Sequence, residues 1–509
     1  MFNNIRELLN ARIAEYGDKR FLLSESDGRV WTYEEFGQVV HQTAEMLRSQ
    51  GIGKGDVVSL LMPNSAEYII AYFACWQIGA VAGPVNSLLK SEEIDWVVGN
   101  SESKLLLSEP PASSGGFENG HDETRFGIPC VRLDLTSLPP DDAGGSDIDI
   151  AHDDDAIIIY TSGTTGKPKG CLLTHGNVIA NARQIVEWMG FGEGDRLLTV
   201  MPLFHMNAVS VTTMSALYAG GSTVVSPKFS ASRFWDIIEK YQITSFGSVA
   251  TMLSMLLSRQ QSAVSDQQNA PPLVPRPSSL RFAMCGSAPV PAELLRNFEE
   301  KFGVLVIEGY GLSESTCRST FNPPNENRRP GSCGLPIGNE MRVVDEEDKD
   351  VPDGELGEIV LRGPNIFKGY FKNPEASAEA FRGGWFHTGD IGYRDADGFY
   401  YIADRKSDMI IRGGENIYPR EIDDVLYRHP AVQHAAVIGV PDQLYGEEVA
   451  AFVVLKTGTT STDDEIIAYC REHLADYKCP KTVHFVDDIP KGPTGKLLKR
   501  ELAKLLNAG

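Results

Sequence analysis

Short apolar segments alternate with longer amphipathic segments in the first part of the chain. Residues 32–50 repeat apolar positions at helical spacing, and residues 68–81 are apolar enough for a buried helix. Residues 56–62 and 103–108 are short apolar runs of the kind found in buried strands. Strands that alternate with helices are typical of α/β domains, so we expect a series of βα units.

The polar segments indicate where domains and connections lie. Residues 109–155 and 259–279 are rich in Ser, Pro, Gly or Gln, and we expect both to be exposed connections. After Asp404 the composition changes and a Gly pair follows. A chain of 509 residues exceeds one core. We therefore predict a large α/β N-terminal domain of βα subdomains (residues 1–404) and a small, mobile α+β C-terminal domain (residues 405–509).

Composition narrows the classes of partner. A net charge of −22 argues against nucleic acid and anionic membranes as partners. No apolar run reaches the roughly 18 residues of a membrane span, and we expect no integral membrane segment. The eight cysteines show no metal-ligand spacing and are typical of free thiols in a reducing compartment. These features favour a cytoplasmic enzyme.

One loop carries the strongest chemical signal. The apolar run Ile157–Ile159 leads directly into the sequence YTSGTTGKPKG. Such a loop exposes many backbone N–H groups, which together with hydroxyl and Lys side chains can surround a polyphosphate. It is not a Walker A loop, because Pro168 follows Gly166-Lys167 where Ser or Thr is required.

Four further strings occur in order after this loop. They are EGYGLSES (308–315), WFHTGD (385–390), DRKSDMIIRGGENIYPREI (404–422) and PKGPTGK (490–496). Each is weak alone, but together they resemble the adenylate-forming superfamily of acyl-CoA synthetases, luciferases and nonribosomal-peptide adenylation domains. The whole chain looks closest to fatty-acid and crotonobetaine/carnitine CoA ligases. This resemblance implies two AMP-binding domains, the second of them mobile.

The resemblance also implies roles for individual residues. Lys496, Glu314 and His205 would be catalytic, Glu314 would hold Mg²⁺, and Ser407 would be the hinge. Ser313 replaces the usual Thr and keeps its hydroxyl, whereas Ser407 departs from the Asp or Lys common at the hinge. CoA would contact Gly413, Gly414 and Glu415. ATP or AMP would be bound by Thr161, Ser162, Gly163, Thr164, Thr165, Gly166, Lys169, Ser287, Ala288, Glu308, Gly309, Tyr310, Gly311, Ser313, Asp390, Ile402 and Arg405.

The acyl pocket is expected around His205, Asn207, Ser248 and Gly286. The stretches 206–213, 246–252 and 284–288 are small and mostly apolar, and they contain no Lys, Arg or Asp. An unpaired charge would be costly to bury there. The sequence therefore predicts a carboxylic acid with an aliphatic body, such as a fatty acid.

These observations predict an ATP-dependent acid–CoA ligase. It would use ATP, Mg²⁺ and CoA to convert a small-molecule carboxylic acid to an acyl-adenylate, release pyrophosphate, and transfer the acyl group to CoA. Three alternatives stay open: a crotonobetaine/carnitine-type ligase, an adenylating enzyme that loads a carrier protein or stops at the adenylate, and a catalytically silent nucleotide-binding regulator. The oligomeric state is open, with a homodimer as one alternative.

Overall fold

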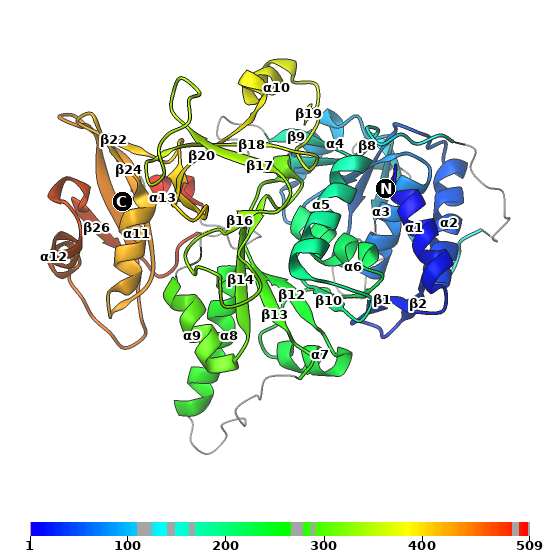
Figure 1. Cartoon of the computed structure of the whole chain (residues 1–509), viewed down its shortest axis with the longest axis horizontal. Coiled ribbons are helices and arrows are strands. Elements are labelled where there is room, and N and C mark those ends of the chain that lie inside the picture. Colours follow the sequence, from blue (N-terminus) through cyan, green and yellow to red (C-terminus); the bar gives the residue numbers. More distant parts are fainter. Residues whose placement is uncertain are drawn as a thin grey trace.

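The computed structural model describes residues 2–108, 124–125, 127–139, 148–161, 168–265, 278–286, 290, 292–490 and 498–506. Figure 1 shows a large N-terminal part, drawn in blue to yellow, and a smaller C-terminal part, drawn in orange and red. The protein is thus a mixed α/β chain with a large N-terminal domain and a smaller C-terminal domain, as predicted. The position of the boundary at residues 404/405 stays a prediction.

One sheet of the N-terminal domain is parallel through its centre and has antiparallel strands at its edges. Its strands occur in the order β16 (Leu335–Pro336), β15 (Thr320–Phe321), β14 (Leu305–Tyr310), β13 (Phe282–Cys285), β12 (Ser245–Ser248), β10 (Arg196–Thr199), β11 (Ser222–Val225), β1 (Arg20–Ser24) and β2 (Val30–Thr32).

A second sheet carries the predicted phosphate loop between two of its strands. Its order is β19 (Gly369–Tyr370), β9 (Lys169–Thr174), β8 (Asp155–Thr161), β4 (Val81–Pro84), β3 (Val57–Leu61), β5 (Leu105–Ser108), β7 (Ile128–Arg132) and β6 (Thr124–Arg125). The expectation that residues 109–155 only connect other elements is wrong in part, because Cys130 of β7 pairs with Leu106 of β5.

Helices cover these sheets and bury their apolar faces. They are α1 (Ile5–Tyr16), α2 (Tyr33–Ser49), α3 (Ala66–Gln77), α4 (Ser91–Asn100), α5 (His175–Met189), the π-helix η1 (Asn207–Met214), α6 (Ser215–Tyr218), α7 (Phe234–Tyr241), α8 (Ala250–Ser265) and α9 (Ala292–Phe302). The start of α2 is a capping box, in which Thr32 accepts from the Glu35 N–H and the Glu35 carboxylate accepts from the Thr32 N–H. The prediction for residues 259–279 is also wrong in part, because α8 continues to Ser265.

A third, antiparallel sheet lies between the other two sheets and the C-terminal domain (Figure 1). Its order is β17 (Glu340–Val344), β18 (Gly357–Arg362), β20 (Phe386–Arg394) and β21 (Tyr400–Arg405). The short elements η2 (Ser313–Ser315), α10 (Pro374–Ala380) and η3 (Arg382–Gly384) accompany it. In this sheet Asp390 of β20 stands opposite Arg405 of β21.

The C-terminal domain has its own buried clusters, which begin at Ile410 and are separate from the main core of the N-terminal domain. Its sheet has the order β23 (Glu415–Ile417), β22 (Ile410–Arg412), β25 (Gly446–Leu455) and β24 (Val432–Asp442), and β26 (Thr482–Phe485) pairs with β25. The helices are α11 (Pro419–Arg428), α12 (Asp463–His473), η4 (Asp476–Lys478) and α13 (Lys499–Leu506). Across the described residues, no helix is long and apolar enough to cross a membrane.

Candidate active site

Three predicted nucleotide-binding residues form one chain of contacts. The Tyr310 hydroxyl donates to Asp390 Oδ2 at 2.6 Å, and Arg405 Nε lies 3.1 Å from Asp390 Oδ1. The Asp390 carboxylate raises the pKa of Arg405, and burial together with Asp390 raises the pKa of Tyr310. The result is a fixed carboxylate between an aromatic ring and a cation, a combination suited to a nucleoside and its phosphates.

A second group surrounds Glu314, the predicted metal ligand. Tyr370 donates from its hydroxyl to Glu314 Oε1 at 3.1 Å, and Lys169 Nζ lies 5.1 Å from the centre of the Tyr370 ring. Burial and the nearby Glu314 carboxylate raise the pKa of the Cys171 thiol. The site therefore places a carboxylate and a Lys side chain on either side of Tyr370, at the mouth of the predicted phosphate loop.

Several predicted residues lie outside the described part of the chain. They are Ser162, Gly163, Thr164, Thr165, Gly166, Ser287, Ala288 and Lys496. The two ends of the phosphate loop are described, and there Thr161 of β8 pairs with Lys169 of β9 across the hairpin. The roles of these residues therefore stay predictions.

Two glycines of the EGYGLSES string are required by close packing of the backbone. A Cβ atom on Gly309 would lie 2.4 Å from Phe321 Cδ1, and one on Gly311 would lie 2.1 Å from the Cys317 carbonyl oxygen. Both distances are far below van der Waals contact. The glycines thus let β14 and η2 fold closely around the positions of Tyr310 and Ser313, and the Ser313 side chain is half-buried.

Glu308 differs from the other acidic residues of the site. It is 7% exposed, it accepts a hydrogen bond from the Gly331 N–H at 2.9 Å, and burial raises its pKa to about 8. At neutral pH this carboxyl is mainly protonated. Glu308 is therefore suited to a neutral hydrogen-bonding role beside the nucleotide rather than to binding a cation.

The predicted hinge lies where β21 turns toward the C-terminal domain. Arg420 of α11 donates from its side chain to the Ile402 carbonyl and from its backbone N–H to Asp404 Oδ2 at 2.9 Å. Ser407 lies in the exposed turn between β21 and β22, and its hydroxyl donates to Asp408 Oδ1 at 3.2 Å. Hinge motion at Ser407 stays a prediction.

The predicted CoA-binding residues form the tip of the β22–β23 hairpin. Gly413 and Gly414 have φ angles of +60° and +91°, a conformation that favours glycine. These two residues and Glu415 are exposed, and exposed apolar side chains flank the tip at Ile411, Leu444 and Tyr445. The Gly413 N–H donates to the Tyr445 carbonyl at 2.8 Å, and the tip offers an exposed apolar surface to a large ligand.

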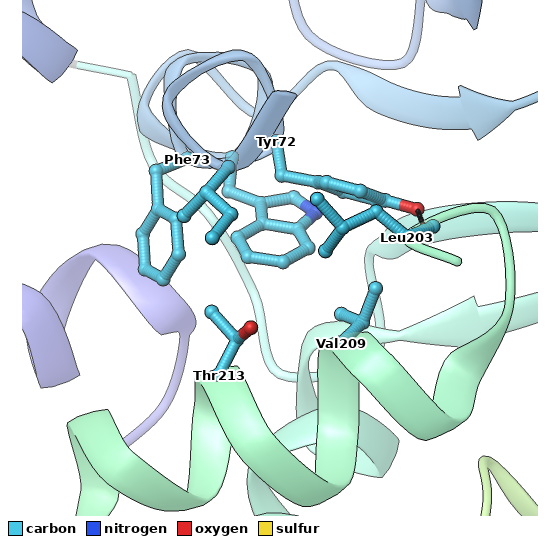
Figure 2. Close-up of a pocket in the computed structure, with 7 residues that line it drawn as sticks. Tyr72, Phe73, Leu203, Val209 and Thr213 are labelled. Atoms are coloured by element: carbon cyan, nitrogen blue, oxygen red, sulfur yellow. Dashed lines mark hydrogen bonds between the residues drawn. The ribbon is translucent and has the colours of Figure 1, made fainter. Parts of the chain in front are cut away.

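The predicted acyl pocket begins at the π-helix η1. π-Helices are rare and occur mostly at functional sites. Figure 2 shows Val209 and Thr213 of η1 directed toward Tyr72 and Phe73 of α3, where the Tyr72 hydroxyl donates to the Leu203 carbonyl at 2.8 Å. This apolar face is packed too tightly to admit a water molecule. The predicted acyl pocket therefore does not lie on this face of η1.

Three buried side-chain atoms at or just before the start of η1 have no hydrogen-bond partner in the described structure. Asn207 is 5% exposed, and neither its amide nitrogen nor its amide oxygen has a hydrogen-bond partner. His205 Nε2 is buried without a partner, and burial lowers the pKa of His205 to about 4, so that its imidazole is neutral at physiological pH. Unsatisfied buried groups of this kind need an explanation, and a bound ligand supplies one.

The other predicted pocket residues lie at the ends of β12 and β13. Ser248 donates to the Met284 carbonyl at 2.9 Å, so its hydroxyl proton is already used. Gly286 adjoins Arg318, because a Cβ atom on Gly286 would lie 2.8 Å from Arg318 Nη2. A buried guanidinium thus packs against Gly286, a residue of the predicted acyl pocket for which the sequence indicated no charge.

Sequence reasoning missed two residues of the site, Tyr370 and Arg318. Tyr370 lies in the string KGYF, where β19 pairs with β9 of the phosphate-loop hairpin. Arg318 follows Glu314 by four positions. It is a charged residue among Ser, Thr and Cys residues, and this contrast in the sequence could have identified it. Neither residue lies in one of the sequence strings that carry the family resemblance.

The predicted metal site suits an ion to which the protein supplies few ligands. Among the described residues, no group of three or more His, Cys, Asp or Glu could hold a metal. Mg²⁺ is commonly bound by one or two carboxylates together with substrate phosphates and water. The single Glu314 carboxylate at the mouth of the phosphate loop fits that pattern.

Comparison with known proteins covers nearly the whole chain. Family models described as "AMP-binding enzyme" and "AMP-binding enzyme C-terminal domain" match residues 9–371 and 421–496. The sulfoacetate–CoA ligase of Cupriavidus necator is 36% identical, over 100% of this chain and 98% of that protein. The crotonobetaine/carnitine–CoA ligase of Escherichia coli is 33% identical, over 98% of each. ATP-bound MatB from Rhodopseudomonas palustris has a TM-score of 0.87 at 31% identity, over 99% of each chain.

Proposed function

The chain belongs to the AMP-binding enzyme family and is an AMP-forming acid–CoA ligase that uses ATP, Mg²⁺ and CoA, and from this premise we propose what each part of its site does. The contacts among Tyr310, Asp390 and Arg405 carry the proposal. Tyr310 binds the adenine ring, Asp390 holds the ribose hydroxyls, and Arg405 contacts ribose or phosphate.

In the first step the substrate carboxylate attacks the α-phosphorus of ATP, and pyrophosphate leaves. Both reactants are anions, so the site must offset their repulsion. Lys169, the loop 162–167 and Lys496 contribute positive charge or N–H donors, and the Ser313 hydroxyl binds the α-phosphate. Mg²⁺, held by Glu314, would offset negative charge on the phosphates.

In the second step the CoA thiol attacks the acyl-adenylate carbonyl, and AMP leaves. We propose that the C-terminal domain rotates about Ser407 between the steps. Rotation withdraws Lys496 and brings Gly413, Gly414 and Glu415 to the CoA. The exposed apolar side chains beside that hairpin support this role, because the pantetheine arm of CoA needs an apolar surface.

The identity of the acid cannot be taken from the relatives. One acts on sulfoacetate and another on crotonobetaine or carnitine. The part of the substrate beyond the reacting carboxylate is therefore negatively charged in one relative and positively charged in the other. The sequence-based expectation of an aliphatic or fatty acid did not take account of Arg318. Because a buried cation borders Gly286, we propose that the pocket takes a short polar acid in preference to a long apolar one.

AMP release tests the proposed function. The purified protein should form AMP and acyl-CoA in equal amounts when it is given ATP, Mg²⁺, CoA and a short-chain acid. AMP that accumulates at the same rate without CoA, together with unbound acyl-adenylate, would favour the alternative that stops at the adenylate. Transfer to a carrier protein in place of CoA would favour the carrier-loading alternative.

A further inference from the structure

We propose that Arg318 binds a second acidic group, a carboxylate or a sulfonate, on the acid that this enzyme activates. The inference rests on the proposed function, since it concerns the far end of the same substrate. It makes Arg318 a specificity-determining residue and predicts a substrate with two negative charges.

The first support is the state of the Arg318 side chain. Arg318 is 2% exposed, and its Nε atom is buried without a hydrogen-bond partner. Its Nη1 atom donates to the Cys317 carbonyl at 3.3 Å, and the guanidinium carbon lies 5.5 Å from the centre of the Phe321 ring. Within the described ranges, no Asp or Glu forms an ion pair with it. A guanidinium has five N–H donors, and among the described residues the buried Nε–H donor of Arg318 has no acceptor.

The second support is the place of this guanidinium. A Cβ atom on Gly286 would lie 2.8 Å from Nη2 and 3.0 Å from Cζ, so the guanidinium packs directly against the Gly286 backbone and only a glycine fits at this position. Gly286 directly follows β13, and β12 is the next strand. On β12, a Cβ atom on Gly247 would lie 2.7 Å from Asn207 Oδ1. Glycines on two neighbouring strands thus pack against the buried side chains of Arg318 and Asn207. They lie near the carboxyl ends of parallel strands, where ligands bind in open α/β sheets.

The third support is that Arg318 is held rigidly against η1. Asn181 Nδ2 donates to the Arg318 carbonyl at 2.7 Å, and Asn181 Oδ1 accepts from the Arg318 N–H at 3.3 Å and from the Ser210 hydroxyl at 2.9 Å. Asn365 Nδ2 donates to the same carbonyl at 3.2 Å. The backbone of Arg318 is therefore fixed before a ligand arrives, as a binding residue requires.

These observations favour an anionic ligand over a purely structural role. A buried charge without a partner is strongly unfavourable, and an incoming anion removes that penalty while it satisfies the free donors. The neutral amide of Asn207 and the neutral imidazole of His205 add hydrogen-bonding groups without adding charge. An aliphatic chain against Arg318 would leave its buried Nε–H donor unsatisfied.

Matched acids test the proposal on the full-length enzyme. Butyrate, succinate and 3-sulfopropionate have similar lengths and differ in the group at the far end, and CoA-dependent AMP release gives kcat/KM for each. For the wild type we expect the two doubly charged acids to exceed butyrate by roughly 100-fold or more, as for other sites that leave polar groups unpaired with the wrong substrate. The ratio of succinate to 3-sulfopropionate tells which acidic group the site prefers.

The variants Arg318→Met and Arg318→Lys separate binding from structure. Arg318→Met should abolish the preference for the second charge by lowering kcat/KM for succinate and 3-sulfopropionate relative to butyrate, whereas Arg318→Lys should retain part of the preference. Thermal unfolding of each variant with and without ATP shows whether it is folded. A wild type that prefers butyrate, or a preference that survives in Arg318→Met, would overturn the proposal while the ligase activity stands. If no acid supports CoA-dependent AMP release, the proposed function itself fails.

Discussion

Tyr310 and Asp390 are 80 positions apart in the chain, and a hydrogen bond of 2.6 Å joins them in the site. Tyr310 ends β14 of the large parallel sheet, whereas Asp390 belongs to the third sheet beside Arg405. The hydrogen bond thus connects two sheets at the point where we place the nucleoside. Substitution of either residue therefore tests ATP binding most directly.

Asp390→Asn should raise KM for ATP by roughly 10- to 100-fold, because hydrogen bonds to charged groups contribute about 1.5–3 kcal/mol. The substitution also leaves Arg405 without its charged partner. Tyr310→Phe retains the ring and should change KM less. Asp397→Asn, at an exposed ion pair with Arg329, is the matched control. An unchanged KM for ATP in Asp390→Asn, measured by pyrophosphate exchange, would remove Asp390 from the nucleotide site.

Glu308 predicts a specific dependence of stability on pH. Its pKa in the folded protein is about 8, against an ordinary value of 4.5. Between these values the unfolded chain has lost the proton and the folded chain keeps it, so the free energy of unfolding falls as pH rises from 4.5 to 8. Each pKa unit corresponds to about 1.4 kcal/mol.

Glu308→Gln removes this titration and keeps a group that can accept from the Gly331 N–H. The variant should match the wild type near pH 5 and exceed its free energy of unfolding near pH 8 by about 2–5 kcal/mol. Urea denaturation at the two pH values measures the difference. Asp423, whose pKa burial raises to about 7, acts in the same direction in both proteins and cancels in the comparison. The exposed Glu355→Gln variant should show no such difference, and an equal effect there would refute the assignment to Glu308.

The family resemblance of separate motifs predicted which distant residues would meet. Tyr310, Asp390 and Arg405 were named from three separate strings, and the structure brings them together. Arg318 could not be placed in this way. Its proposed role depends on the close packing of Gly286 and on the lack of an ion pair with Asp or Glu among the described residues, which are properties of tertiary packing.

The same limit applies to Tyr370 and Ser248. Tyr370 joins Glu314 and Lys169 only because β19 pairs with β9, a pairing that no local pattern indicates. Ser248 was expected in the acyl pocket and stays a prediction there, and its hydroxyl donates to the Met284 carbonyl of the adjacent strand. A small polar side chain in a parallel strand can face a ligand or bond to the neighbouring strand, and the sequence does not show which of the two it does.

Lys496→Ala should slow adenylate formation by roughly 100-fold or more, since one preorganised group at developing charge is worth about 3–4 kcal/mol. The thiol step from supplied acyl-adenylate should be nearly unchanged, because the proposed rotation removes Lys496 before that step. Lys491→Ala, in the same string, is the control. Equal losses in the two half-reactions would show that Lys496 does not act in the first step alone.

Ser407→Pro should keep pyrophosphate exchange and lose acyl-CoA formation. Proline fixes φ and restricts the preceding residue, which limits rotation at this turn. Ser407→Ala removes only the hydroxyl bond to Asp408 and should retain both half-reactions. Acyl-CoA formation at the wild-type rate in Ser407→Pro would place the rotation elsewhere.

The full product balance of a single reaction tests the central claim most directly. The wild-type protein is given ATP, Mg²⁺, CoA and either succinate or 3-sulfopropionate, and AMP, ADP, pyrophosphate and acyl-CoA are quantified over time. We expect one AMP and one pyrophosphate for each acyl-CoA, no ADP, and no acyl-CoA when the acid is omitted. ADP with phosphate in place of AMP with pyrophosphate, or AMP release that does not depend on the acid, would contradict the account.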